Sequence, residues 1–385
     1  MKIRKIVIAP DSFKESLTAL EAAEAIRDGL RQVWPNAEYV LVPMADGGEG
    51  TVRALVDALH GEIITQTVTG PLGTPTAAFY GLINHGHTAV IEMSAAAGIE
   101  KTGPESRDPL HATTYGVGEL IRSALDHGAN HIILGLGGSA TNDGGCGMAQ
   151  ALGARLLDNG GNELSEGGAS LIHLETIDLS RMDQRLNHVR VEAATDVTNP
   201  LTGPEGASAV FGPQKGATPD MVRLLDQALT RFARIVARDY HIDINSPPGS
   251  GAAGGLGAGA LFFLKSSIRP GIDLVIKESG LEQKMADAAL VITGEGKIDG
   301  QTVFGKTPVG VAQCAKRAHL PVIALAGSLG EGCEAVYDHG IDALLPIVPG
   351  PVSLDQALHH ARFNLIRTAA NTARLWQLAG YGQSF

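Results

Sequence analysis

Acidic residues stand inside several glycine-rich segments of this sequence, and the combination indicates phosphate and metal chemistry. Five segments have the pattern of a turn between a buried strand and a helix: 44–51, 135–148, 248–259, 293–302 and 326–332. Glycine permits a tight turn and a close approach of phosphate oxygens, and the N–H groups at a helix start attract anions. Each segment taken alone is better explained as a tight turn between a strand and a helix. Because three of the segments also contain acids, a ligand made of phosphate and magnesium is favoured.

The segment GQTVFGKT, residues 300–307, matches the phosphate-loop pattern G-x-x-x-x-G-K-[ST]. A phosphate loop leaves a buried strand directly and enters a helix at its Lys-Ser/Thr pair. Here we expect the preceding strand to end near Thr293, and Thr307 and Pro308 to be the N-cap and first residue of the next helix. Pro308 also has no N–H to offer a phosphate. We therefore expect that Lys306 does not clamp a nucleotide.

The residues just before this motif are better candidates. Glu295 and Asp299 are the expected magnesium ligands, since carboxylates suit Mg²⁺ and both lie where nucleotide phosphates are expected. Gly294, Gly296 and Lys297 are the expected phosphate contacts, because backbone N–H groups and an ammonium complement a phosphate.

The N-terminal segment APDSFKES is a candidate for substrate binding. Asp11, Ser12 and Lys14 follow the first expected strand, at the edge where open α/β sheets bind ligands. The structural alternative makes Asp11 and Ser12 turn residues and Lys14 a solvated side chain. A second glycine segment, MADGGEGT, adds three expected substrate-binding residues: Asp46, Gly47 and Gly48.

Asp196 in ATDVTNPLTG follows the expected strand VRVEA, and NPLTG then turns the chain sharply. A carboxylate in this position sits on a rigid support beside a small pocket. It serves equally well as an Asx-turn or a cap at that turn. Two chemical roles stay open, namely accepting the proton of an attacking hydroxyl and holding magnesium.

Apolar runs and helical patterns alternate along the chain and position these residues. The N-terminal strands at 5–10, 39–44 and 62–68 are nearly continuous in apolar residues, which indicates a parallel sheet covered on both faces. The same alternation returns near the C-terminus, with strands at 288–294, 321–327 and 343–348 and helices at 308–318 and about 331–339. Capping boxes start a helix after Thr18 and a long closing helix after Ser353.

The middle of the chain has a different pattern. It contains a pair of neighbouring strands at 77–83 and 88–93, a helix at 113–127 and two further strands at 131–137 and 189–197. A second helix starts at Thr218-Pro219 and runs to about Tyr240. With 385 residues, two domains are expected. We predict a discontinuous Rossmann-like domain with a parallel sheet from residues 1–70 and 285–385, and an inserted α/β domain from residues 71–284.

Composition excludes several classes of partner. A net charge of −11 without a Lys/Arg cluster argues against nucleic acid and anionic membrane surfaces. The longest apolar run is too short and too rich in glycine to span a bilayer. Three cysteines far apart give no disulfide framework and suit a reducing cytoplasm. The oligomeric state is left open.

Seven motifs carry a family resemblance along nearly the whole chain. In order they are IAPDSFKESLTA, ADGGEGT, GLGGSATNDGG, TDVTNPLTG, VFGPQKGA, PGSGAAGGLG and VITGEGKIDGQT with GKTPVGVA. The chain resembles the type I glycerate kinase family in all of them. The resemblance implies two α/β domains, one built from both chain ends and the other inserted between them.

The resemblance also implies an enzyme that uses ATP and Mg²⁺ and acts on small molecules. The implied reaction converts D-glycerate to 2-phospho-D-glycerate in organic-acid catabolism of the glyoxylate or glucarate type, with 3-phosphoglycerate as the alternative product. It favours a catalytic role for Asp196, and we expect Lys14 to be catalytic as well.

Two other classes of function are alternatives to a kinase. A dinucleotide-dependent oxidoreductase is expected to have G-x-G-x-x-G after the first strand, where this sequence has APDSFK. A non-catalytic sensor of sugar acids leaves the number of acids in the loops unexplained.

Overall fold

The computed structural model describes residues 3–381, and its α/β architecture confirms the predicted fold class. Contacts divide the chain into two compact units. The first unit contains the residues up to Asp46, the segment Arg53–Leu59 and the chain from Ile272 onward; the second contains Gly47–Val52 and His60–Gly271. The domain boundaries predicted near residues 70 and 285 stay a prediction, since the division into these two units rests on contacts alone.

The first unit is built on a five-stranded sheet drawn from both chain ends. Its order is β13-β12-β11-β1-β2, and every neighbouring pair is parallel. The strands are β1 (Lys5–Ile8), β2 (Glu38–Leu41), β11 (Leu290–Ile298), β12 (Val322–Leu329) and β13 (Ala343–Pro346). The parallel sheet expected from the two chain ends is therefore present.

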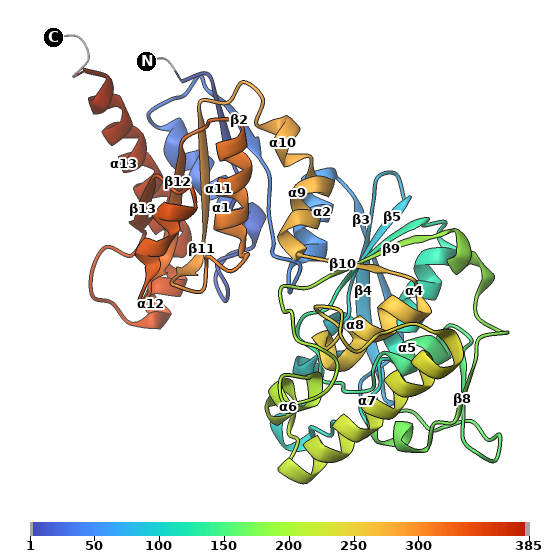
Figure 1. Ribbon diagram of the computed structural model, residues 1–385. Helices are drawn as coiled ribbons and strands as arrows, with labels where there is room; N and C mark the ends of the chain where they lie inside the picture. The colour runs from blue at the N-terminus through green and yellow to red at the C-terminus, as the bar shows by residue number, and fades with distance from the viewer. Residues whose placement is uncertain (1–2, 382–385) are drawn as a thin grey trace. The chain divides into compact units, whose positions relative to one another are not determined.

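Two helices cover one face of this sheet. Apolar residues of α1 (Ala19–Arg31) and α13 (Ala361–Tyr381) share a core with Ile6, Ile8 and Ile292 of the central strands. Figure 1 shows α13, drawn in red, beside this sheet. A Cβ on Gly29 of α1 would lie 2.2 Å from the carbonyl oxygen of Ile366, so glycine allows the two helices to approach closely.

The capping boxes predicted at Thr18 and Ser353 are both present. The expected long closing helix is two helices, α12 and α13. The remaining helices that lie wholly or partly in this unit are α2 (Thr51–Leu59), α9 (Gly271–Ser279), α10 (Leu281–Lys284), α11 (Thr307–Arg317), the 3₁₀ helix η6 (Cys333–His339) and α12 (Leu354–His359).

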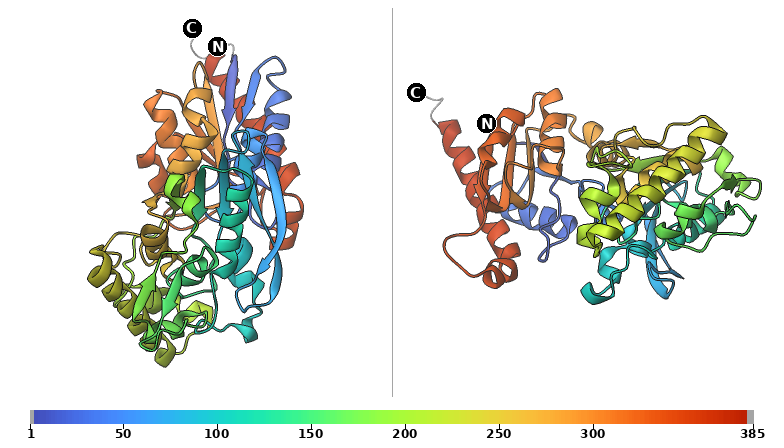
Figure 2. Two further views of the ribbon diagram at one scale, coloured as in Figure 1. Left: turned by 90° about the vertical axis from the view of Figure 1, so that its right-hand side faces the viewer. Right: turned by 60° about the horizontal axis from the view of Figure 1, so that its bottom comes forward.

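The second unit contains a six-stranded mixed sheet of order β10-β9-β6-β5-β4-β3. Its strands are β3 (Glu62–Thr69), β4 (Pro75–Ile83), β5 (Thr88–Glu92), β6 (His131–Gly135), β9 (Arg190–Ala194) and β10 (Ser267–Arg269). The long β3–β4 hairpin, light blue in the left view of Figure 2, is antiparallel. The expectation that the third strand joins the parallel sheet is therefore wrong, because β3 pairs only with β4.

Helices of the second unit enclose two apolar cores. One core lies between the sheet and α3 (Ser94–Ala97), α4 (Tyr115–Asp126) and α8 (Ala252–Phe263); the other joins α5 (Cys146–Ala151), α7 (Pro219–Tyr240) and α8. Thr218 caps α7 and Pro219 stands in its first turn, as predicted. Shorter elements complete the unit: α6 (Ala207–Phe211), the hairpin β7 (Arg155–Leu157) and β8 (Thr176–Asp178), and the 3₁₀ turns η1 (Ile99–Lys101), η2 (Pro104–Ser106), η3 (Gly168–His173), η4 (Gln184–His188) and η5 (Pro213–Lys215).

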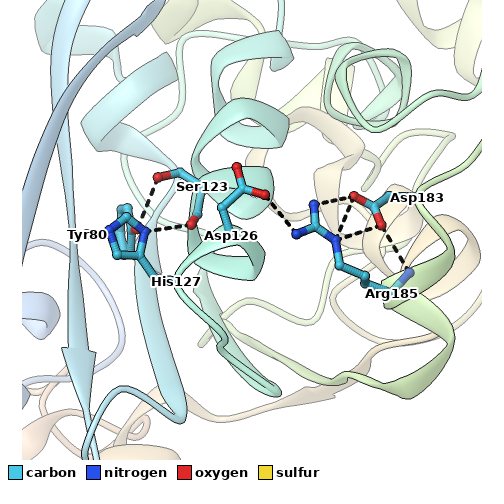
Figure 3. Close-up of polar contacts among 6 residues, drawn as sticks. All are labelled: Tyr80, Ser123, Asp126, His127, Asp183 and Arg185. Atoms are coloured by element: carbon cyan, nitrogen blue, oxygen red, sulfur yellow. Dashed lines mark hydrogen bonds and ion pairs between the residues drawn. The ribbon is translucent and has the colours of Figure 1, made fainter.

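A polar cluster ties α4 to its neighbours in the second unit (Figure 3). The Tyr80 hydroxyl of β4 lies 3.1 Å from the Ser123 hydroxyl and 3.0 Å from Nδ1 of His127, which follows the last residue of α4. On the other side, Arg185 of η4 donates to Asp126 at 2.7 Å. Because Tyr80 is fully buried, these partners satisfy a hydroxyl that is otherwise costly to bury.

Two glycine segments differ from the predicted strand–turn–helix layout. β11 continues to Ile298, so residues 294–298 form a strand, and the predicted strand end near Thr293 is wrong. A Cβ on Gly294 would meet the Leu325 carbonyl oxygen at 2.1 Å, so this glycine permits close strand packing rather than a turn. The segment 248–259 has no strand directly before it, since β9 already ends at Ala194.

We predict that Phe232→Ala strongly destabilises the second unit. Phe232 is fully buried in α7 and stacks on Phe263 with ring centroids 5.8 Å apart. Removing such a ring from a core costs about 3–5 kcal/mol, which corresponds to roughly 10 °C in melting temperature. Phe363→Ala is the matched control, because that side chain is 63% exposed. Similar melting temperatures for the two variants would contradict the assignment of Phe232 to a packed core.

Candidate active site

Asp11 is an unusually placed acid in the first unit. It follows β1, and its backbone N–H donates to the carbonyl of Gly294 in β11 at 2.8 Å. The pKa of Asp11 is raised to about 6 by burial and, to a smaller extent, by the charge of Asp46, against hydrogen bonds from Thr307 and Ser12. Asp11 and Asp46, two of the predicted substrate-binding residues, therefore interact electrostatically.

Glu295 of β11 belongs to the same group of acids. Burial raises its pKa to about 7; the charge of Lys306 and a hydrogen bond from Thr302 oppose this shift, whereas Asp11 and Asp46 add to it. The Thr302 hydroxyl donates to Glu295 Oε1 at 3.0 Å. We call Asp11, Asp46 and Glu295 the acid cluster. The pKa values of Asp11 and Glu295 are raised mainly because burial disfavours their charged forms, so a bound cation would stabilise these two carboxylates.

Asp299, the second predicted magnesium ligand, has a different environment. Its carboxylate pairs with Lys297 at 3.0 Å and accepts the N–H of Gln301 at 2.9 Å. The bond from Lys297, followed by that from Gln301, lowers the pKa of Asp299. Its charge is therefore already compensated. Gly296 and Lys297 belong to β11 together with Gly294, so the predicted phosphate contacts lie on a strand and not in a helix-starting turn.

Lys14 and Ser12 lie in the connection between β1 and α1. The Ser12 N–H donates to Asp11 Oδ1 at 2.6 Å, which is the turn contact that the structural alternative expects. The Lys14 side chain is exposed, and its backbone nitrogen lies 3.4 Å from a Cβ built on Gly296. This connection therefore runs beside β11, close to the acid cluster.

The segment 300–307 follows β11 almost directly, because that strand ends at Ile298. One of the two arguments against a phosphate loop is therefore wrong. Lys306 is the N-cap of α11, so the prediction of Thr307 as the cap is also wrong. The Thr307 hydroxyl instead donates to Asp11 Oδ2. The second argument holds, since Pro308 stands in the first turn of α11.

In the second unit, Gly47 and Gly48 lie at the carboxyl ends of β6 and β9. Gly47 has a φ of +92°, and a Cβ there would approach the Cα of Gly271 to 2.5 Å. A Cβ on Gly137, just beyond β6, would lie 3.3 Å from the Cα of Gly48. The exposed Asp196 accepts the Gly271 N–H at 3.2 Å. Both glycines and Asp196 therefore share one edge of the second sheet.

Asp143, in the glycine segment 135–148, does not have the role expected for an acid of these loops. Its buried carboxylate accepts bonds from the N–H and hydroxyl of Thr114, both at 2.8 Å, and from the N–H groups of Gly145 at 3.1 Å and Gly147 at 3.2 Å. Burial raises its pKa, and these bonds oppose that shift. The carboxylate therefore holds its own loop rather than a ligand.

Sequence reasoning assigned no role to two other buried residues of the second unit. Glu92, the last residue of β5, accepts the Val52 N–H at 2.8 Å and so holds the end of the segment that begins at Gly47. Lys215 of η5 is 2% exposed, and burial lowers its pKa to about 7, against the charge of Asp143. The motif VFGPQKGA contained the only signal for Lys215, but nothing in its pattern predicted burial.

Acids at strand ends and glycine-lined sheet edges are typical of an α/β phosphotransferase. The sequence model described as the glycerate kinase family matches residues 6–377. Glycerate kinase of Bacillus subtilis is 56% identical over 375 residues, covering 97% of this chain and 98% of that protein. Glycerate 2-kinase of Escherichia coli is 50% identical over 369 residues, covering 96% and 97%.

A crystal structure from Salmonella typhimurium LT2, given as a candidate glycerate kinase 2, superimposes with a TM-score of 0.91 at 54% identity. The match covers 98% of this chain and all of that one. The chain belongs to the glycerate kinase family, which confirms the resemblance found in the sequence. None of the helices within residues 3–381 combines the length and apolar character needed to cross a membrane.

We predict that Glu295→Gln flattens the pH dependence of stability in metal-free buffer. Between its ordinary pKa of 4.5 and about 7, folded Glu295 keeps a proton that the unfolded chain has lost. Stability is therefore lost as pH rises through this window, by at most about 1.4 kcal/mol per pH unit for one proton. Urea unfolding from pH 4.5 to 8 with EDTA measures this slope. The exposed Glu331→Gln is the control, and equal slopes in both variants would contradict the environment described for Glu295.

Proposed function

We propose that this protein transfers the γ-phosphoryl group of ATP to the 2-hydroxyl of D-glycerate, with Mg²⁺ as cofactor. The observation that carries the proposal is the acid cluster, with Asp11 just after β1 and Glu295 within β11, in a chain of the glycerate kinase family. The relative named glycerate 2-kinase supports the choice of hydroxyl. Organic-acid catabolism and a cytoplasmic location accompany this proposal as predictions.

The residues of the first unit suit a divalent cation. Burial, and to a smaller extent the neighbouring carboxylates, raises the pKa of Asp11 and of Glu295, and a bound cation would stabilise their charged forms. We propose that Glu295 holds Mg²⁺, with Asp299 as the second ligand and Asp11 or Asp46 as alternatives, because Asp299 already pairs with Lys297. The ion would neutralise charge on the nucleotide phosphates. Gly294, Gly296 and Lys297 remain the proposed phosphate contacts.

Substrate recognition in the first unit is assigned to the connection after β1. Glycerate is small and offers one carboxylate and two hydroxyls, so a single ammonium and a few polar groups suffice to orient it. The exposed Lys14 supplies the ammonium, and Asp11, Ser12 and Asp46 supply hydrogen-bonding groups. Lys14 would also help to neutralise negative charge during transfer, which is the sense in which we call it catalytic.

In the second unit, Asp196 is the proposed base. It stands just beyond β9, its carboxylate is exposed, and the Gly271 N–H fixes one of its oxygens. A carboxylate held in this way can accept the proton of the attacking hydroxyl. Gly47 and Gly48 at the same sheet edge are the proposed substrate contacts of this unit, since a segment without side chains lets a small ligand approach the backbone closely.

Transfer to the 3-hydroxyl, which would give 3-phosphoglycerate, is the alternative product. A nucleotide-dependent oxidoreductase is disfavoured, because the connection between β1 and α1 has acids and a lysine in place of the glycine fingerprint.

Proton-coupled ³¹P NMR of the product tests the proposed function. Purified protein is incubated with D-glycerate, ATP and Mg²⁺. A phosphate on the 2-hydroxyl is next to one C–H and gives a doublet, whereas a phosphate on the 3-hydroxyl is next to a CH₂ group and gives a triplet. We expect the doublet. A triplet would establish the alternative product, and no phosphorylated acid would reject the kinase reaction on glycerate.

We predict that Asp196→Asn lowers turnover by roughly 10²–10⁴-fold, the usual share of a positioned base. The substitution keeps the shape of the side chain and removes its charge, so folding and the KM for ATP should change little. Asp126→Asn is the control, since Asp126 is also exposed in the second unit and pairs with Arg185. Unchanged turnover with a melting temperature several degrees lower would identify Asp196 as a turn residue.

We predict that Lys14→Ala raises the KM for D-glycerate, lowers turnover, or does both, while the melting temperature stays nearly constant. The side chain is exposed, so its loss removes charge from the surface and no packing from the core. Lys316→Ala, which breaks a surface pair with Asp342 in the same unit, is the control. Steady-state kinetics equal to those of the unmodified protein would end the assignment of Lys14.

A further inference from the structure

Lys215 is a charged side chain enclosed within the second unit. Its Nζ donates to the Ser139 hydroxyl at 2.7 Å and to the carbonyl oxygen of Thr141 at 2.6 Å. Both acceptors belong to the segment Leu136–Thr141, which follows β6 and which we call the β6 loop. Within residues 3–381 no carboxylate forms an ion pair with Lys215.

An enclosed ammonium without an ionic partner is expensive for a fold. Asp143 contributes a charge of opposite sign to the surroundings of Lys215, but the four hydrogen bonds of its carboxylate come from other donors. A methionine would fill a similar volume without the cost of desolvating a charge. What lysine adds is two strong hydrogen bonds to one short loop. A buried lysine without an ionic partner departs from the usual pattern of a protein core, and such departures are expected at functional positions.

The outer side of the β6 loop has unused hydrogen-bond donors. The backbone N–H groups of Gly137 and Gly138 have no partner among the residues that the structure describes. Gly138 is exposed and has a φ of +69°, and Gly137 is half-buried beside Gly48. Consecutive free N–H groups at a strand's carboxyl end form a binding place for an anion.

Other contacts hold the remaining parts of the loop. The Ile99 N–H donates to the Gly138 carbonyl at 2.8 Å, and the Ala140 N–H donates to the Ala97 carbonyl at 2.9 Å. The Thr141 carbonyl oxygen, which Lys215 binds, would lie 1.9 Å from a Cβ on Gly254. Lys215 is the one charged side chain in this set of contacts, and it holds the loop from the interior.

We propose that Lys215 is a positioning residue that fixes the β6 loop so that the N–H groups of Gly137 and Gly138 bind the carboxylate of the substrate. This inference rests on the proposed function, because it assigns a subsite to a hydroxy acid. The carboxylate is preferred to a nucleotide phosphate because Gly137 packs against Gly48, a proposed substrate contact. Lys215 itself touches no ligand and acts through the loop.

The kinetic test compares Lys215→Met with the control Lys101→Met, which removes an exposed lysine that donates to the Ala77 carbonyl in the same unit. We expect Lys215→Met to raise the KM for D-glycerate about tenfold or more, the effect of losing one well-placed anion contact. The KM for ATP should change less than about twofold. A KM for ATP that rises as much as that for glycerate would assign the loop to the nucleotide and overturn the proposal.

Hydrogen exchange of the ligand-free protein tests the clamp independently of any activity. The hydrogen-bonded amides of the β6 loop, those of Leu136 and Ala140, should exchange at least about tenfold faster in Lys215→Met, while those of α7 stay unchanged. Ser139→Ala removes one of the two bonds of Lys215 and should shift both measurements in the same direction by a smaller factor. This variant decides the outcome if Lys215→Met does not fold.

The two measurements separate this proposal from the proposed function. Faster exchange in a protein that does not phosphorylate glycerate would reject the proposed function and, with it, the carboxylate subsite. Unchanged exchange in an active kinase would reject the clamp alone. Faster exchange with an unchanged KM for glycerate would also overturn the proposal, because Lys215 would then be structural only.

Discussion

The parallel pairing of β1 with β11 is the contact on which the first unit depends. It aligns Ile6 with Leu290 and is reinforced by the bond from the Thr293 hydroxyl to the Ala9 carbonyl, groups 284 residues apart in sequence. Closing so long a connection costs chain entropy, which the shared core beneath α1 and α13 offsets. The pairing also brings Asp11 beside β11, where its N–H donates to the Gly294 carbonyl next to Glu295.

Ionisable side chains that are removed from solvent have three different kinds of surroundings in this protein. Asp143 is surrounded by four donors and stabilises its own loop. Lys215 binds two neutral oxygens and fixes a neighbouring loop. In the acid cluster, Asp11 and Glu295 have raised pKa values, mainly because of burial and in smaller part because of the neighbouring carboxylates. Buried charged groups whose hydrogen bonds are satisfied stabilise a fold, whereas carboxylates whose charged form is disfavoured by their surroundings favour the binding of a cation. This difference is why we assign the cation to the first unit.

Glycine has several roles here that the sequence pattern does not distinguish. The segment around Gly294 has the composition of a phosphate-binding turn, yet Gly294 lies within β11 because the Leu325 carbonyl leaves no room for a Cβ. Gly47 is required for a different reason, since its φ of +92° and its contact with Gly271 both exclude a side chain. Neither close contact is visible in a single sequence, because the partners lie far away along the chain.

The sequence by itself determined the elements whose signals are local. The start of α1 at Thr18 and the extent of α7 from Pro219 to Tyr240 followed from capping residues and periodicity. The order of the motifs likewise identified the family, and the strand ends identified Asp11, Glu295 and Asp196 as candidates. The tertiary structure alone decided that β3 joins the second sheet, that β11 continues through its glycines and that Lys215 is enclosed. These properties depend on partners distant in sequence, and burial and pKa are set by those partners rather than by the neighbouring residues in the chain.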